Sequence, residues 1–288
     1  MNTFHAVVLG FIFASQGAFG QTPSPAEHSL KVMTFNIRYD NPADGPNRWE
    51  KRKSLVAGVI RESGCDLLGI QEGLLNQLND MQKALPEMGW YGVGRDDGKN
   101  AGEFSALFFR KSRLELVDKG TSWLSETPDK PSKGWDAALP RIVSWGKFRD
   151  KMSGKVFFHF NSHFDHAGKL AREESAKCVK TIAKNLVGAE PFIITGDFNA
   201  NPSSGAYQEL SNGKILPLLD ASRLSSTTQV LDQKTFNGFQ TTKSGWDTID
   251  YIFLPQGIQV LQYQILTQQP EGRFPSDHFP ALAEILLK

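Results

Sequence analysis

Apolar side chains follow two different spacings along this chain, one typical of helices and one typical of strands. Helical spacing predicts helices over residues 49–63, 74–85 and 170–187. Short apolar runs rich in β-branched and aromatic residues predict strands at 30–36, 66–72, 90–95, 104–110, 114–117, 142–149, 155–162, 192–197, 248–254, 258–266 and 281–287. The segment 150–154 is a predicted hairpin turn between two of these strands.

The order of these elements indicates the fold class. A β-α-β-α start leads into a run of strands, a second β-α-β unit and further strands. No linker, fixed-period repeat or low-complexity tract interrupts residues 30–288. We therefore expect one α/β domain, a four-layer α/β sandwich in which two mixed, mostly antiparallel sheets pack face to face with helices outside.

The N-terminus has the pattern of an export signal. An apolar run from Ala6 to Ala14 precedes the small residues Ala18 and Gly20, after which a signal peptidase could cut. The run is shorter than the 18 or so apolar residues of a membrane span. We expect a signal peptide over 1–20, a polar linker over 21–29, and a periplasmic or secreted protein. An uncleaved anchor or an incidental apolar N-terminus is the alternative.

Composition adds two constraints. Hydrophobic residues at 40% and charged residues at 22% describe a globular protein with a substantial core, and the net charge is only +1. Proteins that hold nucleic acid mainly through its phosphates usually carry a basic excess, so this balance argues mildly against such binding. The two cysteines, Cys65 and Cys178, are too few for a disulfide framework, and we expect free buried thiols.

Polar residues capable of metal or phosphate chemistry fall at the ends of predicted strands. Each is ordinary when taken alone, since an Asn at a strand end usually serves a turn or cap. Strand ends along one rim of a sandwich can nevertheless meet in one cleft, and hard cations such as Mg²⁺ prefer carboxylate and carbonyl oxygens. The residues in question are Asn36, Glu72, His163, Asp197, Asn199, Asp250, Asp277 and His278.

Taken together, the segments around these residues resemble a known superfamily. In chain order, MTFNIR, IQE, NSHFDH, GDFN, IDYIF and SDHFP are similar to the motifs of the endonuclease/exonuclease/phosphatase superfamily. The resemblance runs from Leu30 to Leu287. Within the superfamily, the sequence is most similar to secreted bacterial proteins related to deadenylases. It implies the DNase I-like fold and a hydrolase that needs Mg²⁺ or Mn²⁺.

The resemblance also implies a role for each matching residue. Glu72 matches the main metal-binding carboxylate, with Asn36 beside it and Asp277 as a further ligand. Asp197 matches the residue that orients or deprotonates the attacking water, although an Asp250–His278 pair could also act as the base. His163, Asn199 and His278 match groups that contact the phosphate, and Asp250 would orient His278.

Four further expectations concern the rim of the cleft. Glu103 resembles an acidic partner that orients His163, and a solvated strand-entry charge is an equal alternative. Arg141 could hold a phosphate through its guanidinium fork. The loop 121–140, with Trp135, is expected to line the cleft and bind substrate. Asp165 and His166 are expected to cap the helix that starts near residue 169.

The substrate remains open at this point. A phosphodiester of a small or single-stranded molecule is our first choice, and a phosphomonoester or a sphingomyelinase-like lipid substrate is the alternative. A non-catalytic adhesion protein on the same scaffold is a further alternative, which the complete set of polar motif residues argues against. We expect a monomer without a membrane span or an obligate protein partner.

Overall fold

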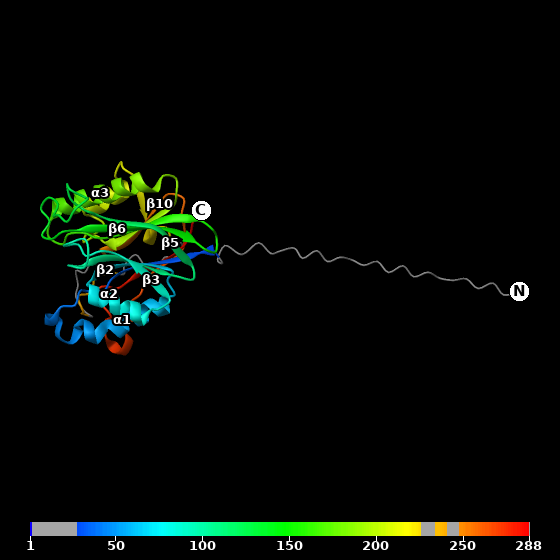
Figure 1. Ribbon diagram of the computed structural model, residues 1–288, viewed down its shortest axis with the longest axis horizontal. Coiled ribbons are helices and arrows are strands. Elements are labelled where there is room, and N and C mark those ends of the chain that lie inside the picture. Colours follow the sequence, from blue (N-terminus) through cyan, green and yellow to red (C-terminus); the bar gives the residue numbers. More distant parts are fainter. Residues whose placement is uncertain (2–27, 226–233, 241–247, 288) are drawn as a thin grey trace.

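Two six-stranded sheets lie face to face in the protein, and helices cover their outer faces (Figure 1). The computed structural model describes Met1 and residues 28–225, 234–240 and 248–287. The first sheet runs in the order β11 (Gln259–Ile265), β12 (Ala281–Leu286), β1 (Leu30–Asn36), β2 (Leu67–Gly73), β4 (Phe104–Arg110), β3 (Met88–Tyr91). The second runs in the order β5 (Leu114–Trp123), β6 (Ile142–Asp150), β7 (Val156–His163), β8 (Phe192–Asp197), β10 (Asp250–Pro255), β9 (Leu218–Asp220). The predicted α/β sandwich is confirmed.

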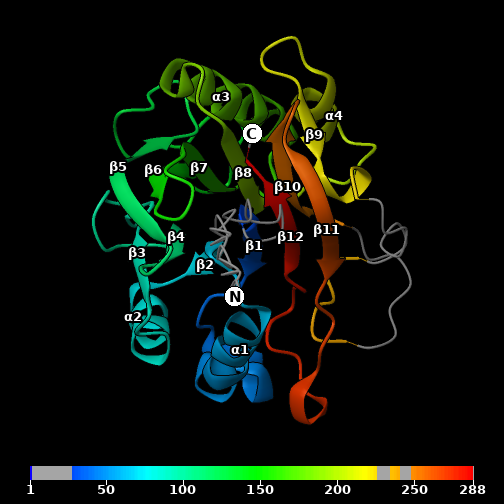
Figure 2. The ribbon, with the colours of Figure 1, turned by 90° about the vertical axis from the view of Figure 1, so that its right-hand side faces the viewer.

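Helices on both outer faces complete the four layers. The first sheet is covered by α1 (Trp49–Ser63) and α2 (Leu75–Ala84), and the second by α3 (Lys169–Val187) and α4 (Gly205–Asn212). Figure 2 shows α1 and α3 on opposite sides of the two sheets. Short 3-10 helices lie at η2 (Pro42–Asn47), η3 (Ala221–Arg223) and η4 (Pro270–Gly272).

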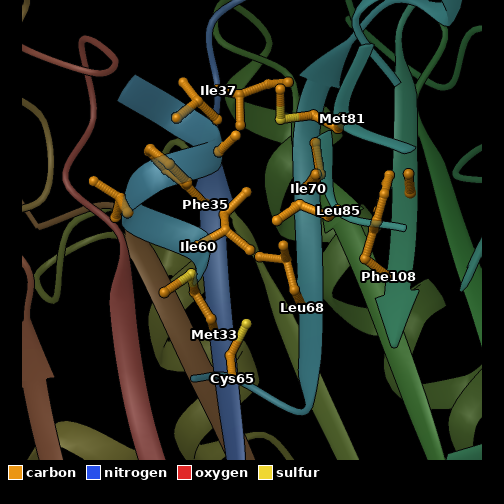
Figure 3. Packing of buried hydrophobic residues seen from close by; sticks show 14 of the residues in the cluster. Met33, Phe35, Ile37, Ile60, Cys65, Leu68, Ile70, Met81, Leu85 and Phe108 are labelled. Carbon is orange, nitrogen blue, oxygen red and sulfur yellow. The ribbon is translucent and has the colours of Figure 1, made fainter. Parts of the chain in front are cut away.

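Helix α1 forms where the apolar spacing predicted it. Its buried stripe includes Leu55, Val56, Val59 and Ile60. Side chains from this stripe pack on the outer face of β1 and β2, where Phe35 and Leu68 point toward the helix (Figure 3). The packing of this apolar face, more than intrinsic propensity, stabilises the helix.

Two parallel strand pairs form the centre of the molecule. Strand β1 pairs in parallel with β2 after the crossover through α1, and β7 pairs in parallel with β8 after the crossover through α3. In register, Asn36 lies opposite Gln71 and His163 lies opposite Asp197. Parallel neighbours end at the same edge of a sheet, so the polar residues that terminate these strands are brought to a common rim.

The space between the sheets changes from apolar to polar toward this rim. Along β1, the inward side chains are Leu30, Val32, Thr34 and Asn36 in that order. Apolar packing gives way to a buried hydrogen-bond network in which Gln71 Nε2 donates to Asn161 Oδ1, 2.6 Å away on the opposite sheet. Buried amides of this kind are stable because they are paired, and they fix the two sheets against each other just below the rim.

Several predicted boundaries were wrong. The strand predicted at 90–95 is β3 at Met88–Tyr91, and beyond it Gly94 makes only an isolated bridge to Phe104. Strand β5 continues to Trp123, six residues past its predicted end, because its whole length pairs with β6. Helix α4 and strand β9 were not predicted. The hairpin turn at 150–154 is confirmed, since Gly154 N donates to Asp150 O at 2.7 Å.

Both cysteines are free thiols, as predicted, but only Cys65 is fully buried, and Cys178 is half-buried. Burial raises the pKa of Cys65 to about 11. The predicted signal peptide and most of the predicted linker lie outside the described residues. Within the residues that are described, no helix has both the length and the apolar character that crossing a membrane would require.

Candidate active site

The strand ends surround a cavity of about 550 Å³. Of the residues singled out in the sequence, those that line it are Glu72, Glu103, Arg141, His163, His166, Asp197, Asn199, Asp277 and His278. Asn36 and Asp250 lie directly behind this lining and hydrogen-bond to it. The expected convergence of distant polar residues is therefore present, whereas their chemical roles stay predictions.

Two carboxylates from opposite sheets meet in the cavity. Glu72 and Asp197 each offer an oxygen within 4.8 Å of the other and of a nitrogen of His278. Asn36 Nδ2 donates to Glu72 Oε1 at 3.0 Å and to Asp197 Oδ2 at 2.9 Å. Burial, and after it the charge of Asp250, raise the pKa of Asp197. A divalent cation fits here, because it would neutralise the two facing carboxylates and accept their oxygens as ligands.

The other two predicted metal ligands are arranged differently. Asn36 presents its amide nitrogen to the carboxylates, while its oxygen accepts from Arg38 N at 2.9 Å. Asp277 lines the cavity but is not part of the cluster of close ligand atoms, and its nearest basic neighbour is Arg38 Nε at 3.8 Å. In this arrangement Asn36 positions both carboxylates, and its direct ligation of a metal stays a prediction.

The surroundings of His278 favour its imidazolium form. Its Nδ1 lies 2.9 Å from Asp250 Oδ2, and its Nε2 lies 3.7 Å from Asp197 Oδ2. Burial disfavours the charge, but Asp250 and Asp197 together raise the pKa of His278 to about 10. A protonated imidazole donates hydrogen bonds and cannot ligate a metal. In that form the oxygens of this cluster, and not the ring of His278, would be available to a cation.

His163 has the opposite charge state. Burial, reinforced by the nearby Arg141, lowers its pKa to about 3, so the ring is neutral. Nε2 lies 3.1 Å from Asn199 Nδ2, an amide that can only donate, so Nε2 accepts and the proton resides on Nδ1. Nδ1 lies 3.6 Å from Glu103 Oε2. That separation is too long for a hydrogen bond, and Nδ1 has no hydrogen-bond partner among the described residues, so the orientation of His163 by Glu103 stays a prediction.

The backbone is strained at two of these strand ends. Glu72 has φ 62° and Asn199 has φ 46°. Both values fall in the left-handed region, which residues other than glycine rarely adopt. Such conformations persist only where the surroundings impose them, and they concentrate at functional sites. At Glu72 the turn lets the carboxylate reach Asn36 Nδ2 and the backbone N–H of Tyr39, 3.0 Å away.

Arg141 is buried deep in the cavity wall and is not a residue of the cleft rim. Its Nε donates to Asp165 Oδ2 at 3.2 Å, and its Nη2 lies 3.0 Å from His166 Nδ1. The expected helix cap by Asp165 and His166 was wrong, because the first amides of α3 donate to Asp136 instead. Asp165 Oδ1 accepts from the backbone N–H groups of Ala167 and Gly168, just before the helix, and Oδ2 is left to accept from Arg141.

The loop 121–140 contributes less to the cavity than expected. Trp123 is buried, and its indole N–H donates to Arg95 O at 2.7 Å, which is a packing role. Trp135 is half-buried and is not among the residues that line the cavity. Leu139 is the lining residue that the loop supplies. The structure therefore gives no support to substrate binding by Trp135.

Sequence reasoning missed several lining residues, of which the basic ones are Arg38 and Arg95. Both had an available signal. Arg38 follows the end of β1 by two residues, and Arg95 was the last residue of the strand predicted at 90–95. Tyr39 and Phe236 also line the cavity, and the ring of Phe236 lies 4.9 Å from that of His278. The two aromatic residues, unlike the arginines, carry no signal by which the sequence could single them out.

Comparison with known proteins identifies the family. A model of the endonuclease/exonuclease/phosphatase family matches residues 33–278, which includes every strand that reaches the cavity. The chain belongs to this family. Enzymes of this family hydrolyse phosphoesters and typically use divalent metals.

Relatives of known structure share the fold over most of the chain. The endonuclease/exonuclease/phosphatase protein of Bacteroides vulgatus is 40% identical, with a TM-score of 0.84 over 90% of this chain and 99% of that one. A protein of Bacteroides thetaiotaomicron described as a mannosyl-6-phosphatase is also 40% identical, with a TM-score of 0.83 over 90% and 100%.

More distant relatives include eukaryotic enzymes. Human Nocturnin is 23% identical over 92% of this chain, and the match covers 67% of Nocturnin. For rat Nocturnin the covered share is 64%, so this chain spans about two thirds of these relatives. At this identity the likeness of the human Nocturnin catalytic domain, with a TM-score of 0.74, supports the fold alone.

Proposed function

We propose that this protein is a divalent-metal-dependent phosphoesterase that cleaves its substrate by attack of an activated water. The observation that carries the proposal is the meeting of Glu72, Asp197 and His278 within 4.8 Å in one cavity. A bound cation would supply positive charge to the phosphoryl oxygens, held by Glu72 with Asp197 beside it.

Charge states favour a division of labour between the side chains. Asp197 has a raised pKa and is buried, which suits a group that takes a proton from water near neutral pH. His278 is already protonated and cannot act as that base, so it would donate to the charge that develops on the phosphoryl group. Asn199 Nδ2 and neutral His163 lie beside Asp197 and would orient the ester.

The size of the cavity favours a small-molecule ester. A volume of about 550 Å³ falls in the ordinary range of small-ligand sites, roughly 300–1,000 Å³. The relative described as a mannosyl-6-phosphatase makes a sugar phosphomonoester the first substrate to test. This choice differs from the phosphodiester that the sequence alone favoured, which becomes the second candidate.

A panel of esters tests the proposal. Hydrolysis of 4-nitrophenyl phosphate, its bis-aryl diester, a hexose 6-phosphate, single-stranded RNA and sphingomyelin would be measured with Mg²⁺, with Mn²⁺ and with EDTA. We expect turnover of at least one small ester, abolished by EDTA and restored by the metal. Binding without turnover of any ester in either metal would overturn the proposal and favour the non-catalytic alternative.

We also propose that the chain is exported, as the apolar run at its N-terminus indicates. Expression of the whole chain in a Gram-negative host, followed by cell fractionation and N-terminal sequencing, tests this. Recovery from the periplasm with Gln21 at the new N-terminus is expected, and full-length protein confined to the cytoplasm would contradict it.

A further inference from the structure

Two arginines in the cavity wall are buried without full pairing. Arg141 is 3% exposed and Arg95 is 7% exposed. Arg141 Nη1 and Arg95 Nε have no hydrogen-bond partner among the residues that the structure describes. Arg95 Nε lies 3.7 Å from Asp96 Oδ1, which is too long for a hydrogen bond. Leaving charged donors buried and unpaired is costly, so these N–H groups are available to an acceptor from outside the chain, either water or an anion.

Neighbouring arginines show that this situation is specific to the pair. Arg38 also lines the cavity, but its Nε and Nη2 donate to both oxygens of Asp44 at 3.0 Å. Arg52 is fully buried behind the cavity, where it donates to backbone carbonyls, among them those of Ile37 and Pro275 at 2.8 Å. The guanidinium groups of Arg38 and Arg52 are therefore used in contacts that stabilise the fold. Arg95 and Arg141 each have an N–H group without a partner among the described residues.

Both arginines line the same cavity as Glu72, Asp197 and His278. His163 bridges the two regions, because its Nε2 is 3.5 Å from Asp197 Oδ2 and its Nδ1 is 3.6 Å from Glu103 Oε2. Arg95 Nη1 in turn donates to Glu103 Oε2 at 2.7 Å. A separate hollow of about 10 Å³ among Arg95, Arg141 and His163 has room for about one water-sized oxygen.

We propose that Arg95 and Arg141 form a clamp for the non-bridging oxygens of a phosphomonoester and so select monoesters over diesters. The inference rests on the proposed function and names the substrate class of the same site. A monoester phosphate carries a charge of about −1.5 to −2 and three acceptor oxygens, whereas a diester has one charge and two such oxygens. In either ester, one non-bridging oxygen would face the cation and another would face His278. Only a monoester has a third such oxygen, which the two arginines could bind.

Glu103 positions one arm of this clamp. Its Oε2 accepts from Arg95 Nη1, which fixes the guanidinium plane while leaving Nε free. Asp165 fixes Arg141 in the same way through Nε and leaves Nη1 free. Arginine suits this arrangement because its planar fork can bind a carboxylate on one edge and a phosphate on another, which the single ammonium of lysine cannot do.

The test compares Arg95→Lys with Arg149→Gln. Arg149 lies on β6, is not among the residues that line the cavity, and has a side chain that is 51% exposed in a pair with Glu115. Steady-state kinetics would be measured with 4-nitrophenyl phosphate and with bis(4-nitrophenyl) phosphate in Mg²⁺. Arg95→Lys should lower kcat/KM for the monoester at least about tenfold, the scale of a lost charge-assisted hydrogen bond, and change the diester by less than about threefold. Arg149→Gln should change neither.

A second readout does not depend on turnover. Binding of inorganic phosphate to EDTA-treated protein would be measured by calorimetry, and Arg95→Lys should raise the Kd at least about tenfold while Arg149→Gln leaves it unchanged. Equal losses on both esters, or an unchanged phosphate Kd, would overturn the clamp. Absence of turnover in the wild-type protein would contradict the proposed function. The Kd for phosphate would still test whether Arg95 and Arg141 bind phosphate.

Discussion

The units β1–α1–β2 and β7–α3–β8 have the same backbone plan and end at the same cavity. Each is a parallel strand pair joined by a helix, and each pair has antiparallel neighbours on both sides, β12 and β4 in one sheet and β6 and β10 in the other. The last strand of each presents a carboxylate, Glu72 in the first unit and Asp197 in the second. Two similar β-α-β units, one in each sheet, thus place a carboxylate in the cavity from opposite sides.

The surroundings of the two carboxylates differ. Glu72 is partly exposed to the cavity and accepts from the amide of Asn36 and the backbone of Tyr39. Asp197 is 1% exposed and lies among Asp250, His163 and His278, and burial raises its pKa. A position at the end of a strand thus places a residue in the site, whereas its burial and its neighbours determine which chemical role it suits. An accessible carboxylate suits a metal, and a buried one suits proton transfer.

Replacing Asp197 should give the largest effect on this comparison. Asp197→Asn keeps the shape and the hydrogen bond from Asn36 but removes the proton acceptor, so turnover should fall by about 10³-fold or more. Stopped-assay kinetics at saturating Mg²⁺ would measure it, with a circular dichroism spectrum as the check on folding. Turnover within tenfold of the wild type would assign the base to another group.

Glu72→Gln should act mainly through the metal. The amide retains the contact to Tyr39 N but loses the charge, so the Mg²⁺ concentration needed for half-maximal activity should rise by at least about tenfold. Part of the activity should return at high Mg²⁺, which is not expected for Asp197→Asn. Metal titrations of both variants would sharpen the comparison. Full loss of activity at every Mg²⁺ concentration, or no shift at all, would contradict the division of roles.

The sequence revealed these strand ends because the inward side chains follow a simple progression. Along β8 the inward residues are Ile193, Thr195 and Asp197, so each step of two residues brings the chain closer to the rim. An alternating pattern that changes from apolar to polar is visible without coordinates. For this reason the fold class and the convergence of the strand-end residues in one cavity could be predicted.

The remaining features depend on contacts between segments that no local pattern records. Arg95 comes after the short β3, and its importance follows from its burial and from its pairing with Glu103 across the connection between β3 and β4. Asp136 caps α3 across 35 positions of sequence, and Asp165 Oδ2 accepts from Arg141. Strand β5 extends through polar residues since pairing with β6, and not apolar spacing, defines its end. Tertiary contacts decided each of these outcomes.

The smallest expected effects concern how the two crossover helices end. Helix α1 stops at Gly64 with φ 63° and ψ 24°, an ordinary left-handed cap, and α3 stops at Gly188 with φ 58° and ψ −117°. A Cβ at either position would meet nothing within 4 Å, so only backbone strain opposes alanine. Gly64→Ala should lower the free energy of unfolding by about 1 kcal/mol. Gly188→Ala should lower it by more, about 2–3 kcal/mol, because that region is nearly closed to side chains.

Gly58→Ala is the matched control for both changes. Gly58 lies in the middle of α1 with helical geometry and open space around its Cα, so alanine should raise the free energy of unfolding by about 0.5–1 kcal/mol. Urea unfolding of the three variants under one buffer would measure the series. If Gly188→Ala proved no more costly than Gly64→Ala, the two units would tolerate the same helix ending, and the difference between them would be confined to the side chains at the cavity.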